Sequence, residues 1–102
     1  MSAIFSINKQ QTSSFQSDIA TVMANQYSIT LNFKGAAFNL DVVLETRTGE
    51  SDWVEITDTA RAGVTGTDET KHYDINLGKH WQVRANVTMN SGKVDLTAYV
   101  SK

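Results

Sequence analysis

The chain has 102 residues, the size of one compact domain, and it contains neither cysteine nor proline. The absence of cysteine excludes a disulfide-stapled scaffold and a zinc–thiolate site, and it fits assembly in a reducing cytoplasm. The net charge is −2 and the nine Lys and Arg residues are scattered, so the composition predicts no nucleic-acid binding.

Residues 1–10 are able to form a strand, because Ala3, Phe5 and Ile7 fall on one face of an extended backbone. The segment is either an N-terminal arm that clasps a neighbouring chain or an extra strand of the domain, which otherwise occupies residues 11–102. As an arm it would bind a partner through Ile4, Phe5 and Ile7. The segment lacks a basic start and Ser6 interrupts its apolar run, so no signal peptide is predicted, and no run approaches the ~20 apolar residues of a membrane span.

Residues 10–25 fit two patterns. Phe15, Ile19 and Val22 recur at helical spacing, whereas Phe15, Ser17 and Ile19 can lie along one face of a strand. Periodicity alone does not decide between a helix and a strand here.

Two strands are predicted next, at Tyr27–Phe33 and Phe38–Leu44, because apolar and polar residues alternate along both. The first is expected to end near Lys34-Gly35, and Val43 is the one exception in the second.

A turn at Thr48–Asp52 leads into a short predicted strand at Trp53–Thr57, in which Val54 and Ile56 share a face. Residues 58–71 are polar, contain two glycines and are expected to be a long connection, and a further short strand is predicted at His72–Leu77.

The C-terminal residues predict a hairpin. Apolar residues alternate with polar ones from Trp81 to Met89 and again from Val94 to Val100, with turn residues at Asn90-Ser91-Gly92 between them. Short alternating strands separated by turn signals predict an all-β chain, an antiparallel β-sandwich (Ig-like or jelly-roll-like) of about seven to eight strands.

No local motif for catalysis, a metal or a cofactor is complete. A calcium loop starting at Asp74 would need Gly where Lys79 stands, and residues 63–67 lack the Lys that completes a phosphate-binding loop. His72 and His80 are expected at the surface and at a strand edge, without further ligands. We therefore predict a protein that is not an enzyme and has no cofactor and no metal site.

Three aromatic residues fall out of step with the apolar face of their strands: Trp53, Tyr73 and Tyr99. They either form an exposed surface for sugars or proteins, or pack into the second layer of the sandwich, which is the preferred interpretation.

From Phe15 to the C-terminus the order of features resembles small virion-associated proteins of tailed bacteriophages. The matching landmarks include Phe15–Ile19, Tyr27–Ile29, Phe33–Phe38, Trp53–Ile56, Tyr73–Ile75 and Ala98–Lys102. The resemblance implies that residues 15–22 form a strand and that the domain is a structural virion part, with no catalytic residues.

The leading hypothesis is therefore a capsid decoration or cement protein, assembled in the host cytoplasm. Its expected partner is the major capsid protein or another virion protein, with a homo-oligomer as a further option. The alternative is a receptor- or carbohydrate-binding module of a phage tail or head fibre. The residues expected to contact the partner are Ile4, Phe5, Ile7 and Tyr99.

Overall fold

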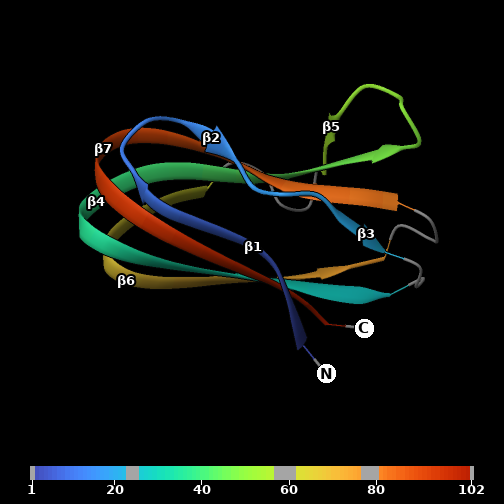
Figure 1. Ribbon diagram of the computed structural model, residues 1–102, viewed down its shortest axis with the longest axis horizontal. Helices are drawn as coiled ribbons and strands as arrows, with labels where there is room; N and C mark the ends of the chain where they lie inside the picture. The colour runs from blue at the N-terminus through green and yellow to red at the C-terminus, as the bar shows by residue number, and fades with distance from the viewer. Residues whose placement is uncertain (1, 23–25, 57–61, 77–80, 102) are drawn as a thin grey trace.

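A computed structural model describes residues 2–22, 26–56, 62–76 and 81–101. These residues form a two-layered antiparallel β-sandwich, which confirms the predicted fold class (Figure 1). Its seven strands are β1 (Ser2–Gln11), β2 (Phe15–Gln16), β3 (Ala20–Val22), β4 (Tyr27–Thr48), β5 (Val54–Glu55), β6 (Ala62–Ile75) and β7 (Trp81–Ser101).

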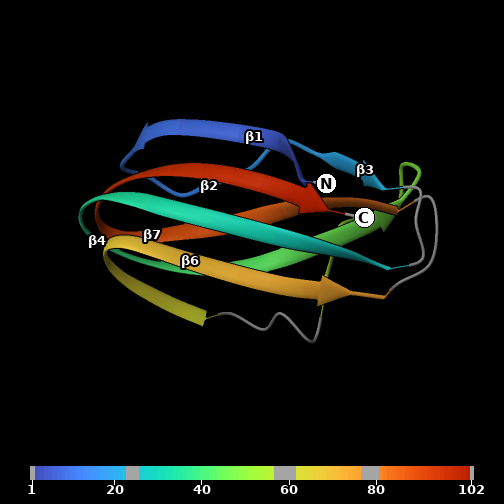
Figure 2. The ribbon, with the colours of Figure 1, turned by 90° about the horizontal axis from the view of Figure 1, so that it is seen from below.

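The two layers are parts of one sheet, because its longest strands run through both of them (Figure 2). β4 and β7 pair along their whole lengths, from Ser28 opposite Ser101 to Thr48 opposite Trp81. The predicted hairpin at Asn90-Ser91-Gly92 is therefore wrong, because the halves of β7 pair with β4 and not with each other. The predicted end of a strand at Lys34-Gly35 is wrong for the same reason.

The turn residues make a sharp bend instead. Four residues with positive φ lie where the long strands fold over, namely Gln10 (51°), Ala37 (45°), Gly66 (135°) and Gly92 (82°). The pairing register shifts next to all four of them, as expected of β-bulges, which bend a strand without ending it. The sheet therefore folds onto itself along one line.

The β1 layer consists of β1 with the second half of β7, the first half of β4 and the second half of β6. The opposite layer, called the β3 layer below, consists of β2, β3 and β5 with the remaining halves of the long strands. Both chain ends of the described part lie at the open end of the sandwich, opposite the bend (Figure 1).

The core lies between the layers and is built by alternate residues, as their periodicity predicts. Along β4 the buried residues are Tyr27, Ile29, Leu31 and Phe33 before the bend and Phe38, Leu40, Val42 and Leu44 after it. Along β7 they are Val83, Ala85, Val87, Val94, Leu96 and Ala98. Val43, the exception in the pattern, is buried as well.

Residues 15–22 form strands β2 and β3, so the helical alternative is wrong. The buried Ser17 between them explains how an irregular segment stays in the sheet. Its backbone N–H donates to the Ala85 carbonyl at 2.9 Å, and its hydroxyl accepts the Ala85 N–H at 2.8 Å. A side-chain oxygen thus replaces one carbonyl of the ladder.

The predicted connection at residues 58–71 is also wrong from residue 62 onward, because β6 pairs with β4 from Ala62 to Ile75. β6 is an outer strand whose polar residues face solvent, so it lacks the apolar alternation that marks a half-buried strand. The short strand β5 spans two residues, and it exposes Val54 while Ile56 is buried, so these two side chains do not share an environment.

Candidate docking surface

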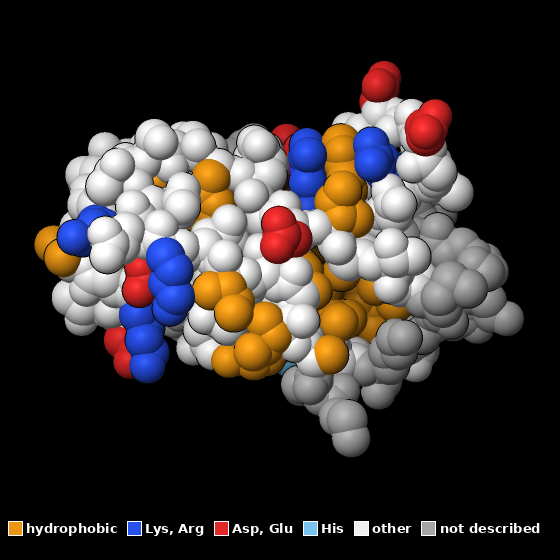
Figure 3. All heavy atoms as spheres, in the orientation of Figure 1, with side chains coloured by type: hydrophobic (Ala, Val, Ile, Leu, Met, Phe, Trp, Pro, Cys, Tyr) orange, Lys and Arg blue, Asp and Glu red, His pale blue; other side chains and the backbone are white. Residues whose placement is uncertain are grey.

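Most of the exposed large aliphatic side chains that the structure describes lie along one edge of the sandwich. Ile4 is 53% exposed, Ile7 55% and Ile19 44%, and the fourth such residue, Val54, lies apart on β5. Figure 3 shows hydrophobic side chains gathered over β1 and between β1 and β3. We call the set Ile4, Ile7 and Ile19 the aliphatic edge. Contiguous exposed apolar residues of this kind mark interaction sites more often than scattered ones do.

A β-bulge at Phe5 explains why both β1 isoleucines face solvent. Ile4 pairs with Tyr99 and Ile7 with Thr97, so the two stand two places apart along β7 and on the same face. The extra residue in between is Phe5, which packs partly buried against the core. Two of the residues expected to contact a partner, Ile4 and Ile7, therefore lie at the surface, while Phe5 mainly supports the strand from inside.

A buried serine fixes β1 to the β3 layer at this edge. Ser6 is 2% exposed, and its hydroxyl accepts the Asp18 N–H at 2.9 Å and donates to Asn8 Oδ1 at 2.7 Å. The contact places exposed Asp18 beside the isoleucines, in a shallow hollow lined also by Ile4, Phe5, Ser6 and Ile7. Sequence reasoning singled out neither Ser6 nor Asp18, because they approach each other only in the folded sandwich.

Tyr99 continues the surface from β1 across the β1 layer. It is half-buried, stands between Ile4 on β1 and Thr30 on β4, and lines a small polar hollow that contains Lys9 and Asp95. The Tyr99 ring thus forms part of the outer face of the β1 layer. Ile4 and Ile7 make the β1 side of this face aliphatic, and the side toward β4 and β6 is polar.

The polar part of this face is a row of cross-strand hydrogen bonds between β4 and β6. Thr30 Oγ1 lies 2.9 Å from His72 Nδ1, and His72 Nε2 lies 3.2 Å from Asp74 Oδ1. Ser28 donates to the same carboxylate oxygen at 2.8 Å, and this bond, aided by His72, holds the pKa of Asp74 below its ordinary value. The row supplies cross-strand stabilisation of the kind that polar pairs give in sheets.

A hydroxyl, an imidazole and a carboxylate in this order invite comparison with a nucleophilic catalytic triad. The His72 and Asp74 side chains, however, are 56% and 83% exposed on an open face, where water screens their interaction. The nearby hollow is lined by Ser28 and Asp74 but by neither Thr30 nor His72. The geometry therefore gives Thr30 no enclosed space in which a substrate would meet it.

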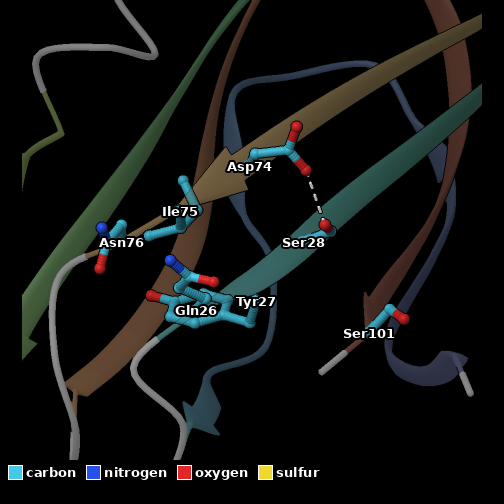
Figure 4. Close-up of a pocket in the computed structure, with 7 residues that line it drawn as sticks. All are labelled: Gln26, Tyr27, Ser28, Asp74, Ile75, Asn76 and Ser101. Carbon is cyan, nitrogen blue, oxygen red and sulfur yellow. Dashed lines mark hydrogen bonds between the residues drawn. The ribbon is translucent and has the colours of Figure 1, made fainter.

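That hollow lies at the open end of the sandwich and joins the ends of β4, β6 and β7 (Figure 4). Polar groups of Gln26, Ser28, Asp74, Asn76 and Ser101 line it together with Tyr27 and Ile75. Tyr27 is 4% exposed and its hydroxyl has no hydrogen-bond partner among the described residues. Burial raises the pKa of Tyr27 to about 12 and also raises that of Tyr73, whose hydroxyl is likewise unpartnered.

Trp53 is held on the outer face of the β3 layer by two arginines. The Arg47 and Arg84 guanidinium carbons lie 4.6 Å and 4.2 Å from the centre of its ring, and Figure 3 shows a hydrophobic group between two basic ones beside β5. Arg84 also donates to Glu45 at 2.8 Å, and Arg47 to Gln82 at 2.7 Å. These contacts fix the loop before β5 by cation–π attraction and occupy the ring faces that a sugar would need.

The three aromatic residues singled out in the sequence thus have different environments. Tyr73 packs against the core, Trp53 lies between arginines, and Tyr99 is the one that shares a face with Ile4. Among the residues that the structure describes, no group of three His, Cys, Asp or Glu side chains is placed to hold a metal ion. The described part of the chain also contains no helix long and apolar enough to cross a membrane. His80, expected at a strand edge, lies outside the described residues.

No protein-family model matches the chain, and no curated protein matches it in sequence. Solved structures match it in fold. The SPBc2 prophage-derived protein YomS has 18% identity and a TM-score of 0.66, over 100% of this chain and 92% of YomS. The CBM22-1 xylan-binding domain of Paenibacillus barcinonensis Xyn10C has 11% identity and a TM-score of 0.54, over 99% and 92%.

A third match comes from the structure of infectious bursal disease virus Gx strain, with 13% identity and a TM-score of 0.56. It covers 98% of this chain and 31% of the viral one. The same sandwich therefore occurs in a prophage protein, in part of a virus protein and in a carbohydrate-binding domain, and at these identities the likeness is one of fold.

Proposed function

We propose that this chain is a non-enzymatic structural protein of a bacteriophage virion, and that it docks on the major capsid lattice as a decoration protein. The observation that carries the proposal is the aliphatic edge, where Ile4, Ile7 and Ile19 are exposed along one margin of an otherwise polar face. Exposed aliphatic side chains are costly to keep in water and gain most when a partner covers them.

Two further observations support a virion role. The fold likeness to the prophage-derived YomS extends over nearly all of both chains. The hydrogen-bonded His72 and Asp74 side chains are 56% and 83% exposed on an open face, which suits a protein that acts by contact.

The test is binding to particles of the encoding virus that were assembled without this chain. Purified protein is expected to co-sediment with them saturably and at a fixed number of copies per capsid. The double variant Ile4→Ser/Ile7→Ser should bind at least about tenfold more weakly, because two anchors of the interface are lost. Val54→Ser removes an equally exposed aliphatic side chain elsewhere and should bind like the wild type. Absence of any binding to such particles would refute the proposal.

The second candidate is a carbohydrate-binding module, which the fold likeness to the xylan-binding domain favours. Sugar stacking needs an aromatic face open to solvent. Trp53 lies between Arg47 and Arg84, and Tyr27 is buried, so Tyr99 is the aromatic residue best placed for it. Binding of the purified protein to a glycan array that is lost in Tyr99→Ala, together with no binding to capsids, would favour this candidate.

A further inference from the structure

β1 is an outer strand of the sheet formed by the described residues. Among the described strands β1 pairs only with β7, so one row of its backbone N–H and C=O groups faces away from the sheet. Native outer strands are usually protected by charges or by shortness. β1 has ten residues, and Lys9 near its end is its one charged side chain.

The side chains beside this open edge have a mixed character that defines what fits there. Ile4 and Ile7 offer apolar contact, and the exposed Asp18 stands next to them in the shallow hollow. The hydrogen bond from the Asp18 N–H to Ser6 fixes the backbone at that point, and the Asp18 carboxylate makes no ion pair within the described residues. A complementary segment is therefore apolar, with a basic residue opposite Asp18.

A second copy of this chain fits the edge less well. Antiparallel pairing of two β1 strands about their middle would place Ser6 and Ile7 near the two-fold axis. Since Asp18 is bonded to Ser6, both copies would bring an unpaired carboxylate toward that axis, and like charges in close register are destabilising.

We propose that β1 receives an extended segment of a virion partner as an added strand, with aliphatic side chains against Ile4 and Ile7 and a Lys or Arg side chain at Asp18. This inference rests on the proposed function and specifies its mode of docking. Backbone hydrogen bonds to β1 give the affinity, and the isoleucines and the carboxylate select the sequence of the added strand.

The experiment is hydrogen exchange, read by mass spectrometry, on free protein and on protein bound to particles assembled without it. Amides within residues 3–8 that face away from β7 are expected to exchange at least about tenfold more slowly in the bound protein, because they become hydrogen-bonded. Amides on the far outer strand β6, at residues 68–74, are the internal control and should not change.

A charge reversal at Asp18 tests the proposed contact with a basic side chain of the partner. Asp18→Lys is expected to weaken capsid binding by about tenfold or more, and Asp68→Lys, an exposed acidic residue on β6, should leave it within about twofold. Circular dichroism of both variants serves to check that they fold.

The outcomes separate the two proposals. Capsid binding with unchanged exchange in β1 would overturn strand addition and leave the decoration role intact, and full binding by Asp18→Lys would overturn the basic contact. A concentration-dependent dimer in analytical ultracentrifugation, abolished by Ile4→Ser/Ile7→Ser, would show that a second copy takes the edge instead. Absence of capsid binding would remove both proposals together.

Discussion

The two outer strands of the β1 layer, β1 and β6, meet solvent in different ways. Each pairs with one neighbour in the described structure, β1 with β7 and β6 with β4. β6 carries charges along its length, at Asp68, Glu69, Lys71 and Asp74, whereas β1 is uncharged from Ser2 to Asn8. Charges on an outer strand discourage pairing with other chains. One edge of this sandwich is therefore protected from association, and the other is left open to it.

The largest expected effect comes from breaking the bend that both edges share. In Gly92→Ala the added Cβ would lie 2.5 Å from the Ala37 carbonyl oxygen, at a φ of 82° that alanine disfavours. We expect a loss of more than about 3 kcal/mol in the free energy of unfolding, measured by urea denaturation. Gly63→Ala is the control, because its Cβ would make only an ordinary contact and its φ is not positive. Equal stability of the two variants would show that the bend tolerates a side chain.

A matched pair of serine substitutions compares how firmly each edge is fastened. Ser6→Ala removes a buried hydroxyl that accepts the Asp18 N–H, and it should cost about 1–3 kcal/mol of stability. Ser28→Ala removes an exposed hydrogen bond to Asp74 and should change stability by less than about 0.5 kcal/mol. Urea denaturation of both variants measures the difference. A larger loss in Ser28→Ala would reverse the ranking.

Alkaline pH is expected to act through the end of the sandwich where β4 meets β6. Because burial raises the pKa of Tyr27 to about 12, the unfolded chain releases this proton near the ordinary tyrosine pKa of 10.0, before the folded chain does. The stabilising contribution is complete below pH 10 and declines by about 1.4 kcal/mol per pH unit until the folded pKa is reached. Tyr27→Phe should reduce this decline in denaturation curves recorded between pH 9 and 11 and, by removing an unpartnered hydroxyl, be neutral or stabilising at pH 7.

Removing two of the four charges of β6 should make the two edges more alike. The double variant Glu69→Thr/Lys71→Thr keeps a strand-forming residue at both places, so stability should change by less than about 0.5 kcal/mol. Without these charges β6 is expected to associate with other copies, seen as dimers and larger species in analytical ultracentrifugation. A variant that stays monomeric at the same concentration as the wild type would show that other features protect this edge.

The smallest expected effect is on stability at acid pH, through the pKa of Asp74. The Ser28 hydrogen bond, which is the largest cause of the lowered pKa of Asp74, favours the charged carboxylate in the folded chain. The resulting stability is present above the unfolded pKa and is lost as pH falls through the folded one. In Ser28→Ala the pKa of Asp74 should rise toward its ordinary value, as measured by an NMR titration of the carboxyl carbon. An unchanged titration would assign the shift to His72 instead.

The faces of the long strands could be predicted from the sequence, but the connections between them could not. Alternation places Ile29 and Leu96 in the core correctly, because burial on one face of a sheet imposes a period of two. At Gly92, however, a hairpin turn and a bend need the same positive φ. The choice depends on whether β7 finds a continuous partner in β4, which lies far away in the chain.

The candidate surface could likewise be predicted only in part from the sequence. Ile4 and Ile7 are both exposed, although simple alternation would place them on opposite faces of the strand, and that they bind a partner stays a prediction. Phe5 turns inward because a bulge shifts the alternation by one residue, and no local signal reveals that bulge. Asp18 becomes part of the surface through a hydrogen bond to Ser6, twelve residues away, which periodicity cannot show.

The pairing of β1 with β7 also has a consequence for synthesis. Ser2 lies opposite Ser101, so β1 is synthesised long before the part of β7 with which it pairs. Contacts between such distant segments make folding slow compared with that of proteins built from local contacts. Throughout this interval both backbone edges of β1 and its two isoleucines lack the cover of β7, and Lys9 is the one charged side chain on the strand.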